Sequence, residues 1–161
     1  MQFFLWPGKS GGTLLQTACK RNSVKCVQIL LESGADAHHC DEWGVYPIHI
    51  CAGCHGNDAD SIKILEMLLE AGDSSDVNLK DSQYGKTPLH YAAYYGNKTM
   101  CGKLVELGAE IDMKDRTGRT PYQSAGRQKS TQDFLRECGA DASGGDLQHV
   151  QRPYPTSPFV S

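Results

Sequence analysis

The sequence predicts an all-α solenoid of four stacked helix–loop–helix units, joined by short β-turn fingers. The first observation is a series of similar segments, because self-similarity at a near-constant period indicates a repeat architecture. The second is that these segments carry apolar stripes at helical spacing, each ending at a glycine. The third is that polar turn residues stand between the segments. The segments begin at Thr13, Tyr46, Thr87 and Thr120, so their starts are separated by 33, 41 and 33 residues.

The first helix of each unit has a start signal and a stop signal, which are clearest in the third unit. Thr87 is followed by Pro88. A threonine hydroxyl can accept an unpaired amide, and proline is tolerated in the first helical turn. The two alanines at 92–93 are good helix formers whose small side chains allow close packing of a neighbouring helix. Gly96 can take the left-handed conformation that ends the helix, and Asn22 tolerates it at the equivalent place in the first unit.

The second helix of each unit is predicted by an apolar stripe with helical period. Its members are Cys26, Val27, Leu30 and Leu31 in the first unit, and Ile64, Leu65, Leu68 and Leu69 in the second. The glycines that end the four second helices are Gly34, Gly72, Gly108 and Gly139. Polar turns at 41–44 and 115–118 then lead into the next unit.

The interval of 41 residues is explained by two insertions. Five extra residues lie inside the second unit, around Asn57–Asp60, and three more lie in the connection from Asp73 to Tyr84. Both stretches are polar and turn-forming. They are therefore predicted to be loop insertions that leave the period intact.

The unit resembles the ankyrin repeat, whose family pattern is D-x-x-G-x-T-P-L-H-x-A-A-x-x-G, followed by an apolar helix that ends in L-L-x-x-G-A-D. The letters T-P-L-H at 87–90 and G-A-D at 34–36 match this pattern nearly letter for letter. The first and last units depart from it, as expected of terminal repeats that have one face toward water. The resemblance covers about Gly11 to Asp141 and implies a repeat domain with units at about 11–38, 41–78, 81–112 and 115–141.

The two ends of the chain read differently from the repeats. Residues 1–10 form an N-terminal segment or cap, in which the apolar run Phe3–Trp6 is expected to cover the exposed face of the first unit. Residues 142–161 are rich in glycine, serine and proline, with little apolar periodicity, so we expect a disordered tail. The letters P-T-S-P at 155–158 are consistent with a polyproline ligand or a phosphorylation site.

Charge and composition argue against several classes of protein. A net charge of −3 over 161 residues gives no reason to expect a nucleic-acid partner, for which a basic domain is usual. No apolar run approaches the roughly 18 residues of a spanning helix, and no secretory signal is recognisable. Seven cysteines, an odd number, argue against a disulfide framework. We therefore expect a cytoplasmic or nuclear protein, monomeric on its own, that binds neither nucleic acid nor membrane.

Two patterns of cysteine and histidine suggest metal chemistry. C-x-x-C-H at 51–55 spells the attachment signature of c-type haem. However, Cys51 and Ala52 fall on the Ala-Ala positions of the repeat, which already explains them. The cluster from His38 to His55 contains enough ligands for a tetrahedral zinc site, although His49 coincides with the structural histidine of the family pattern. A zinc-binding protein that uses this cluster is one alternative.

No catalytic motif is present. The letters P-G-K-S at 7–10 resemble the end of a phosphate-binding loop, but Phe3 stands where that loop requires its first glycine. G-x-S-x-G and H-E-x-x-H are absent from the sequence. We therefore predict neither catalysis nor a cofactor. A further alternative is that the chain is the ankyrin portion of a larger enzyme or channel.

The resemblance implies a non-catalytic protein–protein interaction module, either an adaptor or a regulatory or inhibitory subunit. Ankyrin solenoids bind protein partners through a concave face made of fingers and first-helix residues. Tryptophan, tyrosine and arginine are the residues most enriched at interface hot spots. Carrying over the variable positions of the family gives the predicted partner-binding set: Trp43, Tyr84, Lys86, Tyr91, Tyr94, Tyr95, Arg116, Arg119 and Arg127.

Overall fold

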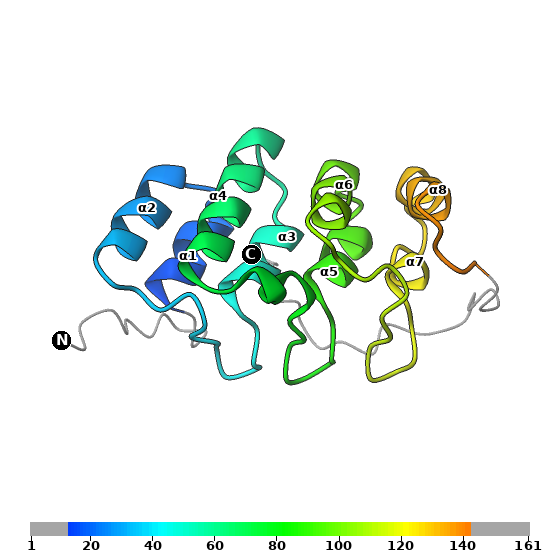
Figure 1. Cartoon of the computed structure of the whole chain (residues 1–161), viewed down its shortest axis with the longest axis horizontal. Helices are drawn as coiled ribbons and strands as arrows, with labels where there is room; N and C mark the ends of the chain where they lie inside the picture. The colour runs from blue at the N-terminus through cyan, green and yellow to red at the C-terminus, as the bar shows by residue number, and fades with distance from the viewer. Residues whose placement is uncertain (1–12, 143–161) are drawn as a thin grey trace.

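The computed structural model describes residues 13–142, whose helices stack in two layers (Figure 1). The first helices of the four units form one layer: α1 (Leu14–Lys20), α3 (Pro47–Gly53), α5 (Pro88–Tyr95) and α7 (Pro121–Ser124). The second helices form the other layer: α2 (Val24–Glu32), α4 (Asp58–Ala71), α6 (Lys98–Glu106) and α8 (Lys129–Glu137). A short 3₁₀ helix, η1 (Ser74–Asn78), follows α4. Turn fingers project from the first-helix layer between units, so the predicted all-α solenoid is confirmed.

The first helices of the terminal units begin with reciprocal hydrogen bonds. At α1 the amide of Gln16 donates to Thr13 Oγ1 over 3.1 Å, and the amide of Thr13 donates to Gln16 Oε1 over 2.6 Å. Thr120 and Gln123 repeat this pair at α7, at 3.4 and 3.0 Å. Such a capping box satisfies amides that a helix N-terminus leaves unpaired. The predicted capping role of threonine is confirmed at both places.

In the two central units a buried histidine replaces this glutamine. The amides of residues 46 and 87 donate to Nδ1 of His49 and His90, each over 3.2 Å, so Nε2 carries the ring proton. The same position in three units also bonds to a backbone carbonyl further along the chain. These bonds run from Gln16 to Val45 (2.7 Å), from His49 to Leu79 (2.9 Å) and from His90 to Arg119 (2.9 Å). Both histidines therefore tie helix starts to later segments.

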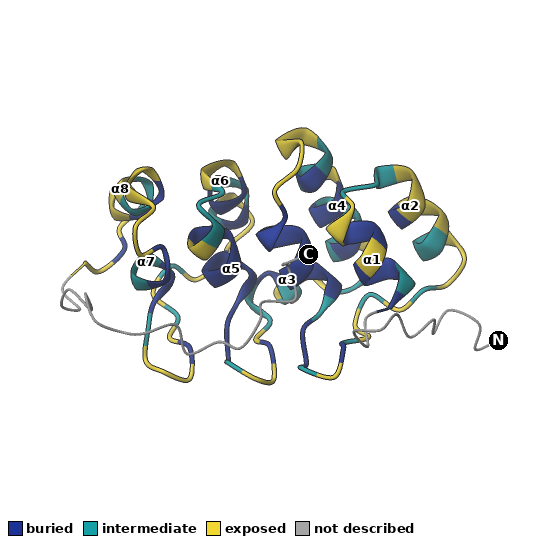
Figure 2. Ribbon diagram, turned by 180° about the vertical axis from the view of Figure 1, so that it is seen from behind, coloured by how far each residue is buried: buried dark blue, intermediate teal, exposed yellow. Residues whose placement is uncertain are grey.

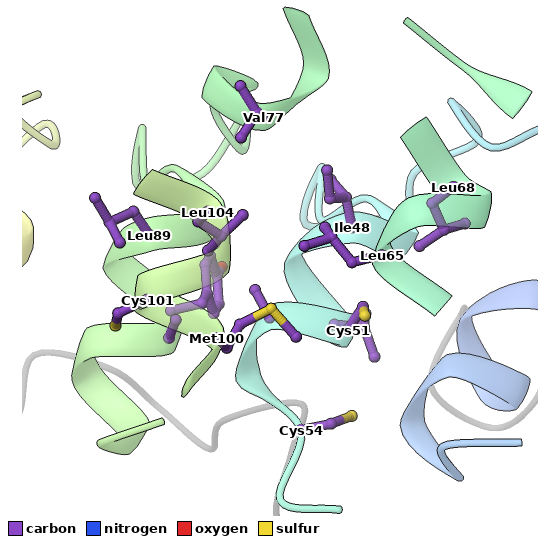
Figure 3. Packing of buried hydrophobic residues seen from close by; sticks show 14 of the residues in the cluster. Ile48, Cys51, Cys54, Leu65, Leu68, Val77, Leu89, Met100, Cys101 and Leu104 are labelled. Carbon is purple, nitrogen blue, oxygen red and sulfur yellow. The ribbon is translucent and has the colours of Figure 1, made fainter. Parts of the chain in front are cut away.

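The second-helix stripes form the core between the layers and between neighbouring units (Figure 3). Ile64, Leu65 and Leu68 of α4 are buried as predicted. In the first unit, however, Cys26 is exposed, so its predicted place in the core is wrong. The residue at the same register in α6 is Met100, which is buried. Cys26 lies on the side of its helix that faces the preceding unit. Among the described residues no unit precedes the first one, so this side of α2 is left uncovered.

The insertion around Asn57–Asp60 is helical, so the loop predicted there is wrong. The five extra residues lengthen α4 to 14 residues, compared with 9 in α2 and 9 in α6. Asn57 caps α4 by accepting the amide of Ala59 over 3.2 Å. Asp58 and Asp60 lie in its first turn, where the positive end of the helix dipole favours carboxylates. The polar residues therefore start a longer helix. Downstream, the connection from Asp73 to Tyr84 begins with η1 and continues as loop and turn, so the loop prediction is only partly right there.

The predicted stops of two first helices are confirmed. Gly96 follows α5 with φ of 74°, and Asn22 follows α1 with φ of 52°, so both are left-handed. Gly96 also needs its small size, because a Cβ there would lie 2.8 Å from the side chain of Gln128. The predicted N-terminal cap with Phe3–Trp6, and the tail predicted beyond Ala142, lie outside the described residues.

Candidate partner-binding surface

Three aspartates hold the fingers in a fixed shape. Asp41, Asp81 and Asp115 each open a finger, and each carboxylate accepts backbone amides from the turn that follows. The donors are the amides of Trp43 and Val45 at Asp41, of Tyr84 and Lys86 at Asp81, and of Thr117 and Arg119 at Asp115. Aspartates bonded to their own turn shape the finger and offer little charge to a partner.

Backbone hydrogen bonds join neighbouring fingers. The amide of Ser82 donates to the Gly44 carbonyl over 3.2 Å, and the amide of Arg116 donates to the Tyr84 carbonyl over 2.8 Å. The first contact is so close that a Cβ at Gly44 would lie 2.3 Å from Ser82 Cβ. The fingers therefore form one row of fixed spacing, with exposed residues at the turns (Figure 2). A rigid surface of this kind loses little conformational entropy on binding.

The middle finger is one residue longer than its neighbours. Six positions separate Asp81 from Thr87, whereas five separate Asp41 from Tyr46 and Asp115 from Thr120. The amides at both 84 and 86 still reach the Asp81 carboxylate, so the longer turn remains closed. Tyr84 is half-buried in this enlarged turn.

The Lys86 ammonium is surrounded by tyrosine rings. Its Nζ lies 5.6 Å from the ring centroid of Tyr84, 5.7 Å from that of Tyr91 and 5.3 Å from that of Tyr94. Each of these is a cation–π distance. Burial lowers the pKa of Lys86, and the nearby carboxylates of Asp115 and Asp81 oppose that effect. The ammonium thus fixes three rings from α5 and the middle finger in one cluster.

This cluster continues to the surface through edge-to-face ring contacts. The rings of Tyr94 and Tyr95 meet at 5.0 Å and 89°, and Tyr95 meets the His55 ring at 5.3 Å and 85°. Tyr94 is 44% exposed, one of three large apolar side chains exposed among the described residues. We call Tyr84, Lys86, Tyr91, Tyr94, Tyr95 and His55 the aromatic cluster. Large aromatic side chains that remain accessible on a rigid surface are typical of interface hot spots.

The structure places the nine predicted residues in three settings. Tyr84, Tyr94 and Tyr95 are accessible members of the aromatic cluster. Lys86 and Tyr91 belong to it but are each only 7% exposed, so their predicted place on the open surface is wrong. Tyr91 turns inward because its hydroxyl donates to Asp81 Oδ2 over 3.2 Å. The remaining four lie on other parts of the row: Trp43 is half-buried on the preceding finger, Arg116 and Arg119 are on the following finger, and Arg127 is exposed beyond α7.

His55 is a member of the cluster that the prediction missed. Its residue type drew attention to metal chemistry instead. The position of His55 in the repeat could have predicted its place in the cluster. His55 lies just after α3, at the position that Gly96 occupies just after α5. A side chain at that position lies at the end of the first helix, beside the next unit.

Three of the proposed zinc ligands are engaged in other bonds. Both ring nitrogens of His49 are bonded to backbone groups, and burial lowers its pKa. Cys51 Sγ donates to the Ser61 carbonyl over 3.2 Å, and Cys54 Sγ donates to the Cys19 carbonyl over 3.3 Å. Between residues 13 and 142, no three His, Cys, Asp or Glu side chains are grouped so that they could hold a metal ion.

Comparison with known proteins identifies the family. A family model described as "Ankyrin repeats (3 copies)" matches residues 59–144, and one described as "Ankyrin repeats (many copies)" matches residues 15–69. The first match alone covers more than half of the chain. The chain therefore belongs to the ankyrin-repeat family, whose repeats are protein-interaction modules and are generally non-catalytic.

Individual relatives are longer and diverse. The human "Ankyrin repeat and SOCS box protein 16" is 32% identical over 151 residues, which is 87% of this chain and 32% of that protein. The human "Transient receptor potential cation channel subfamily A member 1" is 35% identical over 65% of this chain and 9% of its own length. The rat "Diacylglycerol kinase zeta" is 31% identical over 75% of this chain and 12% of its own length. The chain thus spans about a third or less of these relatives. Among its own described residues, no helix is long and apolar enough to cross a membrane.

Proposed function

We propose that this chain is a non-catalytic adaptor or a regulatory or inhibitory subunit that holds a protein partner on its finger row. The observation that carries the proposal is the aromatic cluster, with Tyr94 44% exposed on rigidly spaced fingers. Its rings are held by Lys86 and by one another, so they lose little freedom when a partner covers them. The row ends in Arg116 and Arg119, which are also of a residue type favoured at hot spots.

We also propose the setting in which the module acts. All seven cysteines are free thiols, and Cys19, Cys51, Cys54 and Cys101 are buried. Buried thiols suit a reducing compartment, so the cytoplasm or the nucleus is the expected location. We expect the chain to be monomeric on its own and to bind neither nucleic acid nor membranes.

A second role is favoured by the comparisons. Two relatives are named as a cation channel and a kinase, and this chain matches only 9% and 12% of their lengths. Within a longer enzyme or channel, the same finger row would serve as the docking portion. A longer transcript that encodes a further domain in frame would support this role, and a native protein with the mass of the printed sequence would exclude it.

The proposed function predicts that removing two accessible rings of the aromatic cluster sharply reduces partner capture. A Tyr84→Ala/Tyr94→Ala variant should retain at least about tenfold less partner than the wild type in an affinity capture from cell lysate, read by quantitative mass spectrometry. Tyr91 is left unchanged because its side chain is buried.

The control removes matched apolar surface elsewhere. An Ile29→Ala/Leu107→Ala variant truncates the two other exposed large side chains, which are 62% and 38% exposed and lie on or directly after second helices. It should retain the same partners as the wild type. Unchanged capture by the tyrosine variant, with circular dichroism confirming that it is folded, would remove the aromatic cluster from the binding site.

A further inference from the structure

In the last two units, the charges are segregated between the two layers. The finger and first-helix segments of the last two units, 80–95 and 114–127, contain six cations and two carboxylates. The cations are Lys80, Lys86, Lys114, Arg116, Arg119 and Arg127. The second-helix segments of the same units, 98–113 and 129–141, contain four cations and six carboxylates. Although the overall net charge is −3, the last two units therefore have a basic finger side and an acidic second-helix side.

The two carboxylates of the finger side are not available to neutralise these cations in solution. Asp81 and Asp115 are only 2% and 6% exposed, and both accept hydrogen bonds within their own fingers. They act instead on Lys86, whose charged form they favour. Positive charge therefore dominates the accessible part of this surface.

Ion pairing follows the same division. Within residues 13–142, the ion pairs lie among the second helices and the connections that follow them, as in Lys103–Glu66 (2.7 Å) and His38–Asp76 (2.7 Å). Arg116, Arg119 and Arg127 take part in none of these ion pairs. Arg116 donates through Nη1 to the Gln83 carbonyl over 3.2 Å, which leaves further guanidinium donors for another acceptor.

We propose that the partner segment is an acidic peptide that lies across the last two units. Its carboxylates would pair with Arg116, Arg119 and Arg127, and an adjacent aromatic or aliphatic side chain would pack on the half-buried ring of Tyr84 and the exposed ring of Tyr94. Arginine binds carboxylates through two parallel hydrogen bonds, and complementary charge speeds encounter and sets register. This inference rests on the proposed function and adds to it the chemistry of the partner.

A nucleic acid is a poorer match for the same surface. The accessible cations of this surface are Lys80, Lys114, Arg116, Arg119 and Arg127, which fall short of the roughly 6–10 phosphate contacts of a salt-sensitive nucleic-acid site. The acidic second-helix side would also repel a long polyanion. A short acidic segment needs only the local patch.

The test is a selection from a random linear peptide library displayed on phage, with the whole chain as bait. Wild-type protein should enrich peptides whose combined aspartate and glutamate content is at least about double that of the unselected library. Binding of a selected peptide, measured by fluorescence anisotropy, should weaken by at least about tenfold in an Arg116→Gln/Arg119→Gln/Arg127→Gln variant. It should also weaken when ionic strength rises from about 0.05 M to about 0.5 M.

The control changes the same number of cations on the second helices. A Lys25→Gln/Lys63→Gln/Lys98→Gln variant removes equal charge from exposed positions of α2, α4 and α6, and it should bind the selected peptide like the wild type. Equal weakening in both variants would show a general charge effect and overturn the proposal. Circular dichroism of both variants separates loss of binding from loss of folding.

Three other results would overturn the acidic partner. Enrichment of peptides without acidic bias would do so while leaving the binding module intact. Failure to enrich any peptide would also overturn the acidic partner. The proposed function is tested separately, by the lysate capture with the tyrosine variant. A fluorescent single-stranded oligonucleotide that binds more tightly than the selected peptides would assign the surface to nucleic acid.

Discussion

Replacing His90 with alanine is expected to lower the free energy of unfolding by about 3 kcal/mol. The imidazole is fully buried, and its loss leaves a cavity at the base of α5. It also removes three hydrogen bonds: Nδ1 bonds to the amide (3.2 Å) and to Oγ1 (2.8 Å) of Thr87, and Nε2 donates to the Arg119 carbonyl (2.9 Å). The last of these bonds joins the third unit to the finger of the fourth. Because the stability of a solenoid depends on contacts between neighbouring units, the loss should spread beyond α5.

The chain itself supplies the control for this substitution. Gln16 and Gln123 occupy the position of His90 in the first and last units, and each accepts the amide of the residue that caps its helix. Gln16 also makes the bond toward the next finger, to Val45. A His90→Gln variant should therefore stay within about 1 kcal/mol of the wild type. Urea unfolding followed by circular dichroism measures both values. If the alanine and glutamine variants are equally unstable, the contribution of His90 to the free energy of unfolding comes from the packing of its ring and not from its hydrogen bonds.

Acid is expected to destabilise the protein well above the pH at which carboxylates titrate. Burial lowers the pKa of His90 from 6.5 to about 4, and it lowers the pKa of His49 in the same direction. Between these pH values the unfolded chain binds a proton that the folded chain does not. The contribution of neutral His90 is therefore fully present above about pH 6.5 and declines by about 1.4 kcal/mol per pH unit toward pH 4. The expected loss from this residue is of the order of 3 kcal/mol.

Glutamine substitution also tests this pH dependence. In a His49→Gln/His90→Gln variant, urea midpoints measured from pH 7 to pH 4 should fall much less than in the wild type, because glutamine does not titrate. The pKa of Asp41 is raised by burial, which stabilises the fold slightly at the acidic end of the range. That effect is common to both proteins and cancels in their difference. Parallel pH profiles for the two proteins would contradict a role for the buried histidines.

The sequence predicted the units of this fold well because local signals agree with tertiary packing. Thr-Pro starts, left-handed stops and apolar stripes each act within one unit, and Gly96 and Leu65 occupy the predicted places. The insertion near Asn57 was misread because polar residues are compatible with both a loop and a helix start. In the structure, the capping bond to Ala59 and the backbone bond from the Ser61 amide to the Asn57 carbonyl show that these residues start a helix.

The candidate site was predicted by position but not by exposure. The family register selected Tyr84, Tyr94 and Tyr95, and in the structure Tyr84 and Tyr94 lie beside Lys86 while Tyr95 contacts Tyr94. It could not show that Tyr91 turns inward, because that orientation depends on the carboxylate of Asp81, ten residues earlier, accepting its hydroxyl. In the last unit the same register is held by Ser124, which is too short to repeat that contact. The inward orientation of Tyr91 therefore depends on its pairing with Asp81 and is not a general feature of the repeat.

The most direct measurement of the central claim is site-specific photocrosslinking in cell lysate. Tyr94→p-benzoylphenylalanine places the crosslinker on the aromatic cluster, and Leu107→p-benzoylphenylalanine places it at a comparably exposed position directly after α6. Binding through the finger row predicts a covalent partner adduct from position 94 and none from position 107. An adduct from position 107 alone would contradict the account and place the partner on the second-helix layer.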